Sequence, residues 1–312
     1  MAADGPVVVL AGGTGGAKLA RGMLDVAGED LVVVVNTGDD LEAHGGHVSP
    51  DPDLVTFWLA DRIDARGWGL RDDSFVVMEA LRALGEDVWF NLGDRDLAVC
   101  LARARRLAAG ATLTEAADAL RRAYGVPAAV LPMSDEPVRT WVHAGGAWTD
   151  FQAFMIRAGG RGPVEDVAFR GAEHAAPTPQ VLEAVGAARA VVVGPSNPVI
   201  SIGPILALPG MRDALRACPA PVVAVSPLVG GAVLKGPTDV FMAWAGRSLD
   251  SDGIAACYEG LLDGLVADQR TDAVPTLVTD VAMPDAAARR RVAEATLDFA
   301  LTLAAWPRTR GG

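Results

Sequence analysis

The sequence predicts an α/β protein with a Rossmann-like, doubly wound, mostly parallel sheet and a mainly helical second lobe. The chain opens on an apolar run at Pro6–Ala11, a helical pattern at Gly15–Val26 and a second β-branched run at Leu31–Val35. This strand–helix–strand order is the seed of a doubly wound sheet. In addition, four apolar runs each end in a loop of small polar residues, as parallel strands do where they face a ligand. With 51% hydrophobic and 21% charged residues, the 312-residue chain can bury a large core.

The remaining elements follow in order from hydrophobic periodicity and from turn residues. Further helices are predicted at Leu54–Ile63, Ser74–Leu84, Leu97–Ala109, Thr114–Tyr124, Pro177–Val185 and Ala286–Ala304. Further strands are predicted at Arg189–Val193 and Pro221–Val225, with a β-hairpin formed by Val138–Ala144 and Ala147–Phe154 around a Gly-Gly turn. The Gly- and Arg-rich stretch Arg157–Pro163 is predicted to be a mobile loop.

The strand pattern is interrupted in the middle of the chain. Residues 1–92 and 186–312 are therefore predicted to form a Rossmann-like nucleotide-binding core. Residues 93–185 are predicted to form an inserted helical and β-hairpin lobe.

The charge of the chain restricts its partners. There are 27 basic and 39 acidic residues, a net charge of −12, which argues against nucleic acid or an anionic membrane surface as the main partner. The apolar runs are strand-sized, the first residues lack a signal-peptide pattern, and the three scattered cysteines give neither a disulfide framework nor zinc spacing. We therefore expect a cytoplasmic, soluble protein that acts on small molecules.

A glycine-rich loop follows the first strand and opens the first helix. It reads Gly12-Gly13-Thr14-Gly15-Gly16 and is followed by Lys18. Glycines let backbone N–H groups approach an anion closely, so the loop indicates phosphate binding. Lys18 stands at the third glycine position of a dinucleotide fingerprint, and the loop is not a Walker A motif either. A tight turn without a ligand is the alternative.

Only two of the basic residues are lysines, Lys18 and Lys235, and both lie in glycine-rich stretches. We interpret them as candidates to contact phosphate groups, with chance as the alternative.

Four carboxylates lie within fifteen residues after the second strand: Asp39, Asp40, Asp51 and Asp53. Like charges this close repel unless a metal or a proton relieves them, and oxygen ligands suit Mg²⁺. The alternatives are a helix N-cap for Asp53 and a solvated turn for Asp40. The roles of His44 and His47 stay open, but without a third nitrogen or sulfur nearby they do not indicate zinc.

Three later loops add polar groups. Asn91-Leu92-Gly93-Asp94-Arg95-Asp96 fits either a site or an exposed cap with local ion pairs. Ser196, Asn197 and Ser201, with Ser226-Pro227, offer donors for a phosphate or a base. There is no G-x-S-x-G motif, and Asn36 stands where a nicotinamide dehydrogenase has an acidic residue. The residues alone therefore predict a nucleotide- or phosphate-binding α/β protein, and we expect it to depend on Mg²⁺.

Taken together, these motifs resemble a known family. They occur in the order Gly12–Gly16, Asn36–Asp40, Pro50–Asp53, Leu92–Asp96, Pro132–Asp135, Gly194–Pro198, Ser201–Leu206 and Ser226-Pro227. This order resembles the 2-phospho-L-lactate transferase family (CofD/FbiA) of coenzyme F-420 biosynthesis, over about residues 6–280.

The resemblance implies a Mg²⁺-dependent transferase, commonly a homodimer. A phospholactyl, phosphoenolpyruvyl or phosphoglyceryl group would move from a guanylylated donor to a hydroxyl of the deazaflavin Fo, releasing GMP and forming the F-420-0 precursor. The sequence does not choose among the three acids. The alternative is a non-catalytic nucleotide-sugar-binding regulator of the gluconeogenesis-factor type.

The resemblance also assigns residues. Asp39 and Asp51 match the catalytic, metal-binding carboxylates, and whether Asp51 holds the metal, accepts the hydroxyl proton or does both stays open. The donor would be held by Gly12, Gly13, Thr14, Gly15, Gly16, Ser196, Asn197 and Ser201, with Lys18 and Lys235 near its phosphates. Fo would contact Asp51, Asn91, Asp94, Met133 and Ser134 under the second lobe. Pro52 departs from the family pattern, in which an aliphatic residue is usual.

Overall fold

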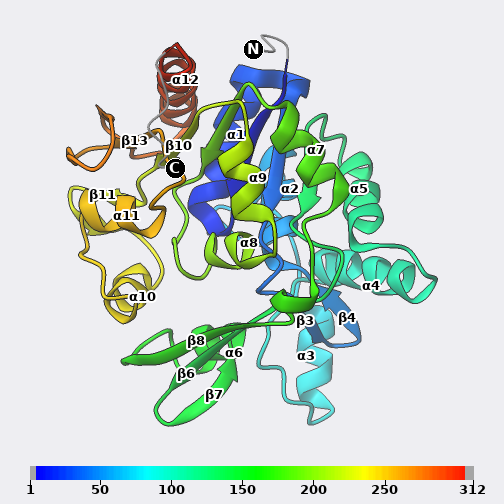
Figure 1. Ribbon diagram of the computed structural model, residues 1–312. Helices are drawn as coiled ribbons and strands as arrows, with labels where there is room; N and C mark the ends of the chain where they lie inside the picture. The colour runs from blue at the N-terminus through cyan, green and yellow to red at the C-terminus, as the bar shows by residue number, and fades with distance from the viewer. Residues whose placement is uncertain (1–4, 306–312) are drawn as a thin grey trace.

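The computed structural model describes residues 5–305, and its centre is a seven-stranded sheet (Figure 1). The strand order is β14-β13-β10-β9-β1-β2-β5, and every neighbouring pair is parallel. The strands are β1 (Val7–Ala11), β2 (Leu31–Val35), β5 (Ala129–Pro132), β9 (Ala190–Val193), β10 (Val222–Val225), β13 (Gly264–Ala267) and β14 (Thr276–Val278). This arrangement confirms the predicted parallel α/β fold.

The central strands are apolar at almost every position because both faces of the sheet are covered. Along β1, Val8 and Leu10 belong to the hydrophobic core on one face, whereas Val7 and Val9 belong to the core on the other. All four side chains are fully buried. Burial on both faces explains why the sequence shows continuous apolar runs here instead of alternation.

Helices cover the two faces as a doubly wound fold requires (Figure 1). One face is covered by α1 (Gly13–Ala27), α2 (Pro50–Leu59) and α12 (Ala286–Leu303). The other is covered by α7 (Pro179–Ala187), α8 (Gly203–Ala207), α9 (Met211–Ala217) and α11 (Ser251–Cys257). A side of the molecule next to these layers holds α3 (Val76–Ala83), α4 (Asp94–Ala108), α5 (Leu113–Ala123) and the short antiparallel pair β3 (Leu41–Ala43) and β4 (Gly46–Val48).

A smaller antiparallel sheet lies below the core in the view of Figure 1. It consists of β6 (Arg139–Ala144), β7 (Ala147–Asp150) and β8 (Val164–Arg170), with α6 (Phe151–Arg157) beside it. A separate hydrophobic cluster fixes this unit to α10 (Thr238–Trp244), because Phe151 and Phe154 both pack against Phe241. Two-residue strands β11 (Leu228–Val229) and β12 (Ala232–Val233) and the 3₁₀ turns Gly28–Asp30 and Ala172–His174 complete the described chain.

The structure differs from the predicted elements in several places. Helix α2 spans Pro50–Leu59, whereas the prediction was Leu54–Ile63, and α8 to α11, β13 and β14 are among the elements that were not predicted. The second hairpin strand ends at Asp150 and not at Phe154, because the Asp150 carboxylate accepts a hydrogen bond from the Ala153 N–H at 2.8 Å and so caps α6. The division into lobes is also different, because β5 lies inside the predicted insertion yet pairs with β2 in the central sheet. Only four residues long and ending in proline, β5 gives little sequence signal.

No helix among residues 5–305 combines the length and the apolar character that crossing a lipid bilayer would need.

Helix α1 packs against α12 at a glycine. A Cβ atom added to Gly22 would lie 2.3 Å from the backbone oxygen of Arg289. The two helices therefore approach more closely than any side chain at this position allows.

We expect Gly22→Ala to lower the free energy of unfolding by about 1–3 kcal/mol, the usual cost of overpacking. Gly186→Ala is the matched control, since Gly186 lies on exposed α7 with open space around its Cβ position. That change should stabilise by up to about 1 kcal/mol through helix propensity. Urea unfolding measures both; equal effects of the two changes would contradict the close approach of α1 and α12.

Candidate functional site

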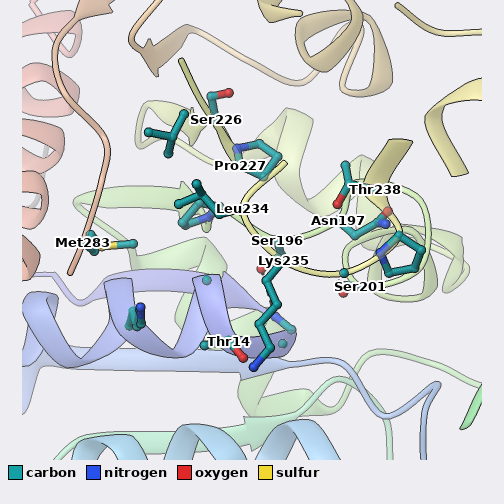
Figure 2. Close-up of a pocket in the computed structure, with 18 of the residues that line it drawn as sticks. Thr14, Ser196, Asn197, Ser201, Ser226, Pro227, Leu234, Lys235, Thr238 and Met283 are labelled. Carbon is teal, nitrogen blue, oxygen red and sulfur yellow. Dashed lines mark hydrogen bonds between the residues drawn. The ribbon is translucent and has the colours of Figure 1, made fainter. Parts of the chain in front are cut away.

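The loops that follow β1, β9 and β10 meet at the carboxyl edge of the sheet around a cavity of about 540 Å³, which we call the first pocket (Figure 2). Its walls include the glycine-rich loop, the serine and asparagine of the β9 loop, and the segment that carries the second lysine. The predicted residues among them are Gly12, Gly13, Thr14, Gly15, Lys18, Asp39, Ser196, Asn197, Ser201 and Lys235. In Figure 2 the Lys235 side chain extends toward Thr14 at the start of α1.

Backbone contacts shape the glycine-rich loop. The Gly12 N–H donates to Ser196 Oγ at 3.2 Å, which ties the β1 loop to the β9 loop. A Cβ atom on Gly15 would lie 2.0 Å from the Pro195 oxygen, so only glycine fits there. Helix α1 begins at Gly13 without a side-chain cap from Gly12 and without an acidic residue in its first turn. Its N-terminus therefore presents N–H groups to the pocket and favours an anion.

Asn36 and Gly13 hold Asp51 in one orientation. The Gly13 N–H donates to Asp51 Oδ1 at 2.7 Å, and the Asn36 amide donates to Asp51 Oδ2 at 3.0 Å. Asn36 is itself fixed, because its Oδ1 accepts the Gly38 N–H at 2.8 Å. Asn36, which stands where a dehydrogenase has an acidic residue, therefore holds the buried carboxylate of Asp51 in place.

Asp39 and Asp51 form a buried acidic pair. Burial raises the pKa of Asp39 well above its usual range, and the charge of Asp51 raises it further. Burial also raises the pKa of Asp51 to about 6, although the Gly13 N–H opposes the shift. Among the described residues, Asp39 Oδ1 has no hydrogen-bond partner. Two carboxylates with an unused oxygen and no cationic neighbour fit a bound cation.

The other two carboxylates of the predicted cluster are already neutralised. Asp53 forms a buried ion pair with Arg103, so it is not the N-cap of α2, a place that Ser49 occupies. Asp40 is buried and not in a solvated turn; it accepts Ser49 Oγ at 2.8 Å and contacts His47 Nε2 at 3.1 Å. Both alternatives considered for these residues are therefore wrong.

His44 and His47 have different hydrogen-bond partners and do not form a shared ligand site. His47 bridges Asp40 and Glu42, with its Nδ1 2.8 Å from the Glu42 carboxylate. His44 Nε2 lies 2.7 Å from the Phe90 oxygen. Their roles are local hydrogen bonding around β3 and β4.

A second pocket of about 420 Å³ adjoins the carboxylate pair. It is lined by Asp51 and Asn91 together with the aromatic side chains Trp68, Trp89 and Phe90. Asp39 lines the first pocket, and Asp51 lines the second. The carboxylate pair therefore lies where the first pocket, whose wall includes the glycine-rich loop and both lysines, meets the second pocket with its aromatic wall.

The other residues expected to contact the acceptor lie elsewhere. Asp94 accepts hydrogen bonds from Ser74 Oγ at 2.6 Å and from two N–H groups at the start of α3, so it caps that helix. Met133 is fully buried in the core, and Ser134 Oγ donates to Glu136 at 2.6 Å. None of these three lines the second pocket. Asn91 does line it and accepts from the Arg82 guanidinium at 2.6 Å.

Sequence reasoning missed Asp96. It lines the second pocket, and burial with the nearby charges of Asp53 and Asp73 raises its pKa to about 7. Its position in Leu-Gly-Asp-Arg-Asp was the available signal, but spacing alone could not separate it from Asp94.

Comparison with known proteins gives a consistent result. A family model described as 2-phospho-L-lactate transferase CofD matches residues 7–295. A 2-phospho-L-lactate transferase of Methanosarcina mazei is 40% identical over 266 residues, 85% of this chain and 87% of the relative. A phosphoenolpyruvate transferase of Kitasatospora aureofaciens is 38% identical over 298 residues, 88% of this chain and 93% of the relative. A crystal structure of a UPF0052 protein from Bacillus halodurans superposes with a TM-score of 0.66 over 94% of this chain and 99% of that one. At 18% identity, this last likeness concerns the fold alone.

The raised pKa of Asp39 makes a prediction about stability. The folded protein holds the Asp39 proton more tightly than the unfolded chain, so this group stabilises the fold at low pH and loses that contribution as pH rises through its folded-state pKa. Without divalent cations, Asp39→Asn should therefore be more stable than the unchanged protein at about pH 8, by about 1–3 kcal/mol, the cost of an unpaired buried polar group.

Urea unfolding in a chelating buffer at about pH 8 and about pH 5 tests this, and the advantage should shrink at the lower pH. Asp272→Asn, at an exposed position, is the control and should show no such trend. An Asp39→Asn protein that is less stable than the parent at the higher pH would contradict an uncompensated charge.

Proposed function

The chain belongs to the 2-phospho-L-lactate transferase CofD family, and on that premise we propose that it transfers a three-carbon phospho-acid group from a guanylylated donor to a hydroxyl of the deazaflavin Fo. The group is phospholactyl, phosphoenolpyruvyl or phosphoglyceryl. The observation that carries the proposal is the Asp39–Asp51 pair at the junction of the first and second pockets.

The reaction exchanges one phosphorus–oxygen bond for another. The Fo hydroxyl oxygen attacks the phosphorus that bears the acid, the bond from that phosphorus to the GMP phosphate breaks, and the hydroxyl proton is lost. A phosphodiester and GMP result. Catalysis of such a step depends on positioning and on neutralising charge at the phosphoryl oxygens.

The first pocket suits the guanylyl donor. Its phosphates would lie on the N–H groups of the glycine-rich loop and near Lys18 and Lys235. Asn197 adds a donor: its Oδ1 accepts backbone N–H groups at 2.9 and 3.3 Å, whereas its buried Nδ2 has no partner in the described part of the chain. An unpaired buried amide in a pocket wall is costly unless a ligand accepts from it.

Asp39 and Asp51 are the residues that would hold Mg²⁺. The unpartnered Oδ1 of Asp39 and the raised pKa values of both carboxyls support this fit. When bound, Mg²⁺ would offset negative charge on the phosphoryl oxygens. Asp51 also lines the second pocket, where its carboxylate would orient the Fo hydroxyl and accept its proton.

The second pocket suits the Fo ring. Trp89 and Phe90 pack edge to face with centroids 5.6 Å apart and give an apolar wall to a flat tricycle. Gln152 and Ile156 of α6 line the same pocket, so the smaller antiparallel unit covers the acceptor and keeps water from the donor.

Turnover tests the proposal directly. Protein, Mg²⁺, Fo and each of the three guanylylated donors are mixed, and GMP is measured by chromatography. We expect GMP and a phosphodiester with at least one donor, and about a hundredfold or greater loss of turnover in Asp39→Asn and Asp51→Asn. Asp272→Asn should retain the parent rate. Donor binding without GMP from any donor would favour the nucleotide-binding regulator and overturn the transferase.

The acceptor site has its own prediction. Trp89→Ala removes part of the apolar wall and should raise the Fo dissociation constant by about tenfold, in keeping with the loss of an aromatic stacking partner. GDP binding should be unchanged. Trp244→Ala, on α10, is the control and should bind Fo as the parent does. Fluorescence titration measures both ligands, and unaltered Fo affinity in Trp89→Ala would move the ring out of the second pocket.

A further inference from the structure

A third pocket, of about 480 Å³, opens from the glycine-rich loop in another direction. It shares Thr14, Lys18 and Lys235 with the first pocket. It then continues along the turn at residues 63–70, which is closed by an isolated β-bridge between Ile63 and Leu70. This turn was not predicted from the sequence. Arg66 and Arg71 are the cationic side chains that the turn adds to the lining.

The third pocket carries an excess of positive charge. Asp64 is the one carboxylate in its lining, and Arg66 binds it at 2.6 Å. The Arg71 guanidinium donates to the neutral Asp61 carbonyl at 3.0 Å. Neither Lys18 nor Lys235 forms an ion pair with any residue between 5 and 305. In a chain of net charge −12, a pocket lined by four cationic side chains and one carboxylate indicates a site for an anion.

Two further observations point to a ligand there. Burial lowers the pKa of Lys18, and the charges of Arg289 and Lys235 lower it further, as expected where positive charge is not offset. Trp58 lines the pocket and is buried, yet its Nε1–H has no acceptor among the described residues. A buried donor without an acceptor is costly for the protein alone.

The turn also connects the third pocket with the other two. A Cβ atom on Gly67 would lie 3.9 Å from Thr14 Cγ2 and 4.0 Å from Lys235 Nζ, so the turn rests on the glycine-rich loop. The next residues, Trp68 and Gly69, line the second pocket. The three pockets therefore meet around the start of α1.

The proposed reaction needs three binding pockets around the phosphorus atom that is transferred. That phosphorus bears the leaving guanylyl group, the incoming alcohol and the three-carbon acid. The first two pockets suit the guanylyl group and Fo. The acid, in each of its three forms, ends in a carboxylate, and no other part of the two substrates needs a second anion site.

We propose that the third pocket binds the carboxylate of the donor's three-carbon acid, with Arg66 and Arg71 as the residues that recognise it and Lys18 and Lys235 between that carboxylate and the donor phosphates. This assignment rests on the proposed function. On this assignment, the turn at residues 63–70 makes the protein specific for donors whose three-carbon group carries a carboxylate, over donors whose group lacks one.

The test compares two donors that differ in one group: GDP esterified on its terminal phosphate with lactate, and the isopropyl ester, in which a methyl replaces the carboxylate. The double variant Arg66→Gln/Arg71→Gln should lower kcat/KM for the lactyl ester by about tenfold to a hundredfold, the range for charge-assisted hydrogen bonds, and leave the isopropyl ester nearly unchanged. Arg62→Gln removes an exposed arginine of the same segment that does not line the pocket, and both donors should react with it as with the parent.

Calorimetric titration of both esters without Fo separates this assignment from the proposed function. A lactyl ester that binds more tightly than the isopropyl ester, with the difference lost in the double variant, supports the third pocket even if no GMP forms. If the double variant turns over both esters and still prefers the lactyl ester as the parent does, the assignment of the third pocket is wrong, but the proposed transferase activity is unaffected. Equal losses with both esters also overturn it, since they would mean a general effect on the donor phosphates or on the fold.

Discussion

The hydrogen bond from the Gly13 N–H to Asp51 Oδ1 connects the first and second pockets, and the rest of the candidate site is arranged around it. Gly13 belongs to the wall of the first pocket and Asp51 to the wall of the second. The same bond fixes the start of α1 against the start of α2, so the phosphate loop and the acidic pair keep one relative position. The amide of Asn36 holds the remaining oxygen of Asp51, which removes the rotation that a carboxylate otherwise has. The relative position of the two pockets is thus fixed by the protein itself, which the proposed group transfer would require.

Charge is distributed selectively among similar residues. Arg103 neutralises Asp53, and Ser49 and His47 hold Asp40, whereas Asp39 and Asp51 are left without a cationic partner. The two lysines are likewise left without a counter-charge. Both lie beside the glycine-rich loop, and neither forms an ion pair within the described residues. Buried or crowded charge destabilises the protein alone and is relieved by ligands of the opposite sign. This distribution of charge is the basis on which we propose a cation at the acidic pair and a phosphate-bearing donor at the glycine-rich loop.

The fold and the position of the glycine-rich loop were predictable from the sequence because β1, β2, β9 and β10 are buried on both faces and appear as uninterrupted apolar runs. The ligand contacts of the second pocket were less accessible. Asp94 and Asp96 differ by two positions in one motif, yet Asp94 caps α3 and Asp96 lines the pocket, a distinction set by the packing of α3 on α4. Asp53 and Arg103, which form an ion pair, are fifty positions apart in the sequence, so no local sequence pattern predicts their contact. The same holds for β5, whose place in the sheet depends on β2.

The bond between the Gly12 N–H and Ser196 Oγ joins residues 184 positions apart. A chain emerging from the ribosome has made β1 and the whole glycine-rich loop long before β9 exists, and most residues of the first pocket's wall come after β9 in the sequence. Contacts of such long range form late and slow the folding of a domain. The first pocket is thus complete only on a nearly finished chain. If the proposed donor binds there, the fraction of molecules that retain it tightly would measure how many in a preparation have reached the native topology.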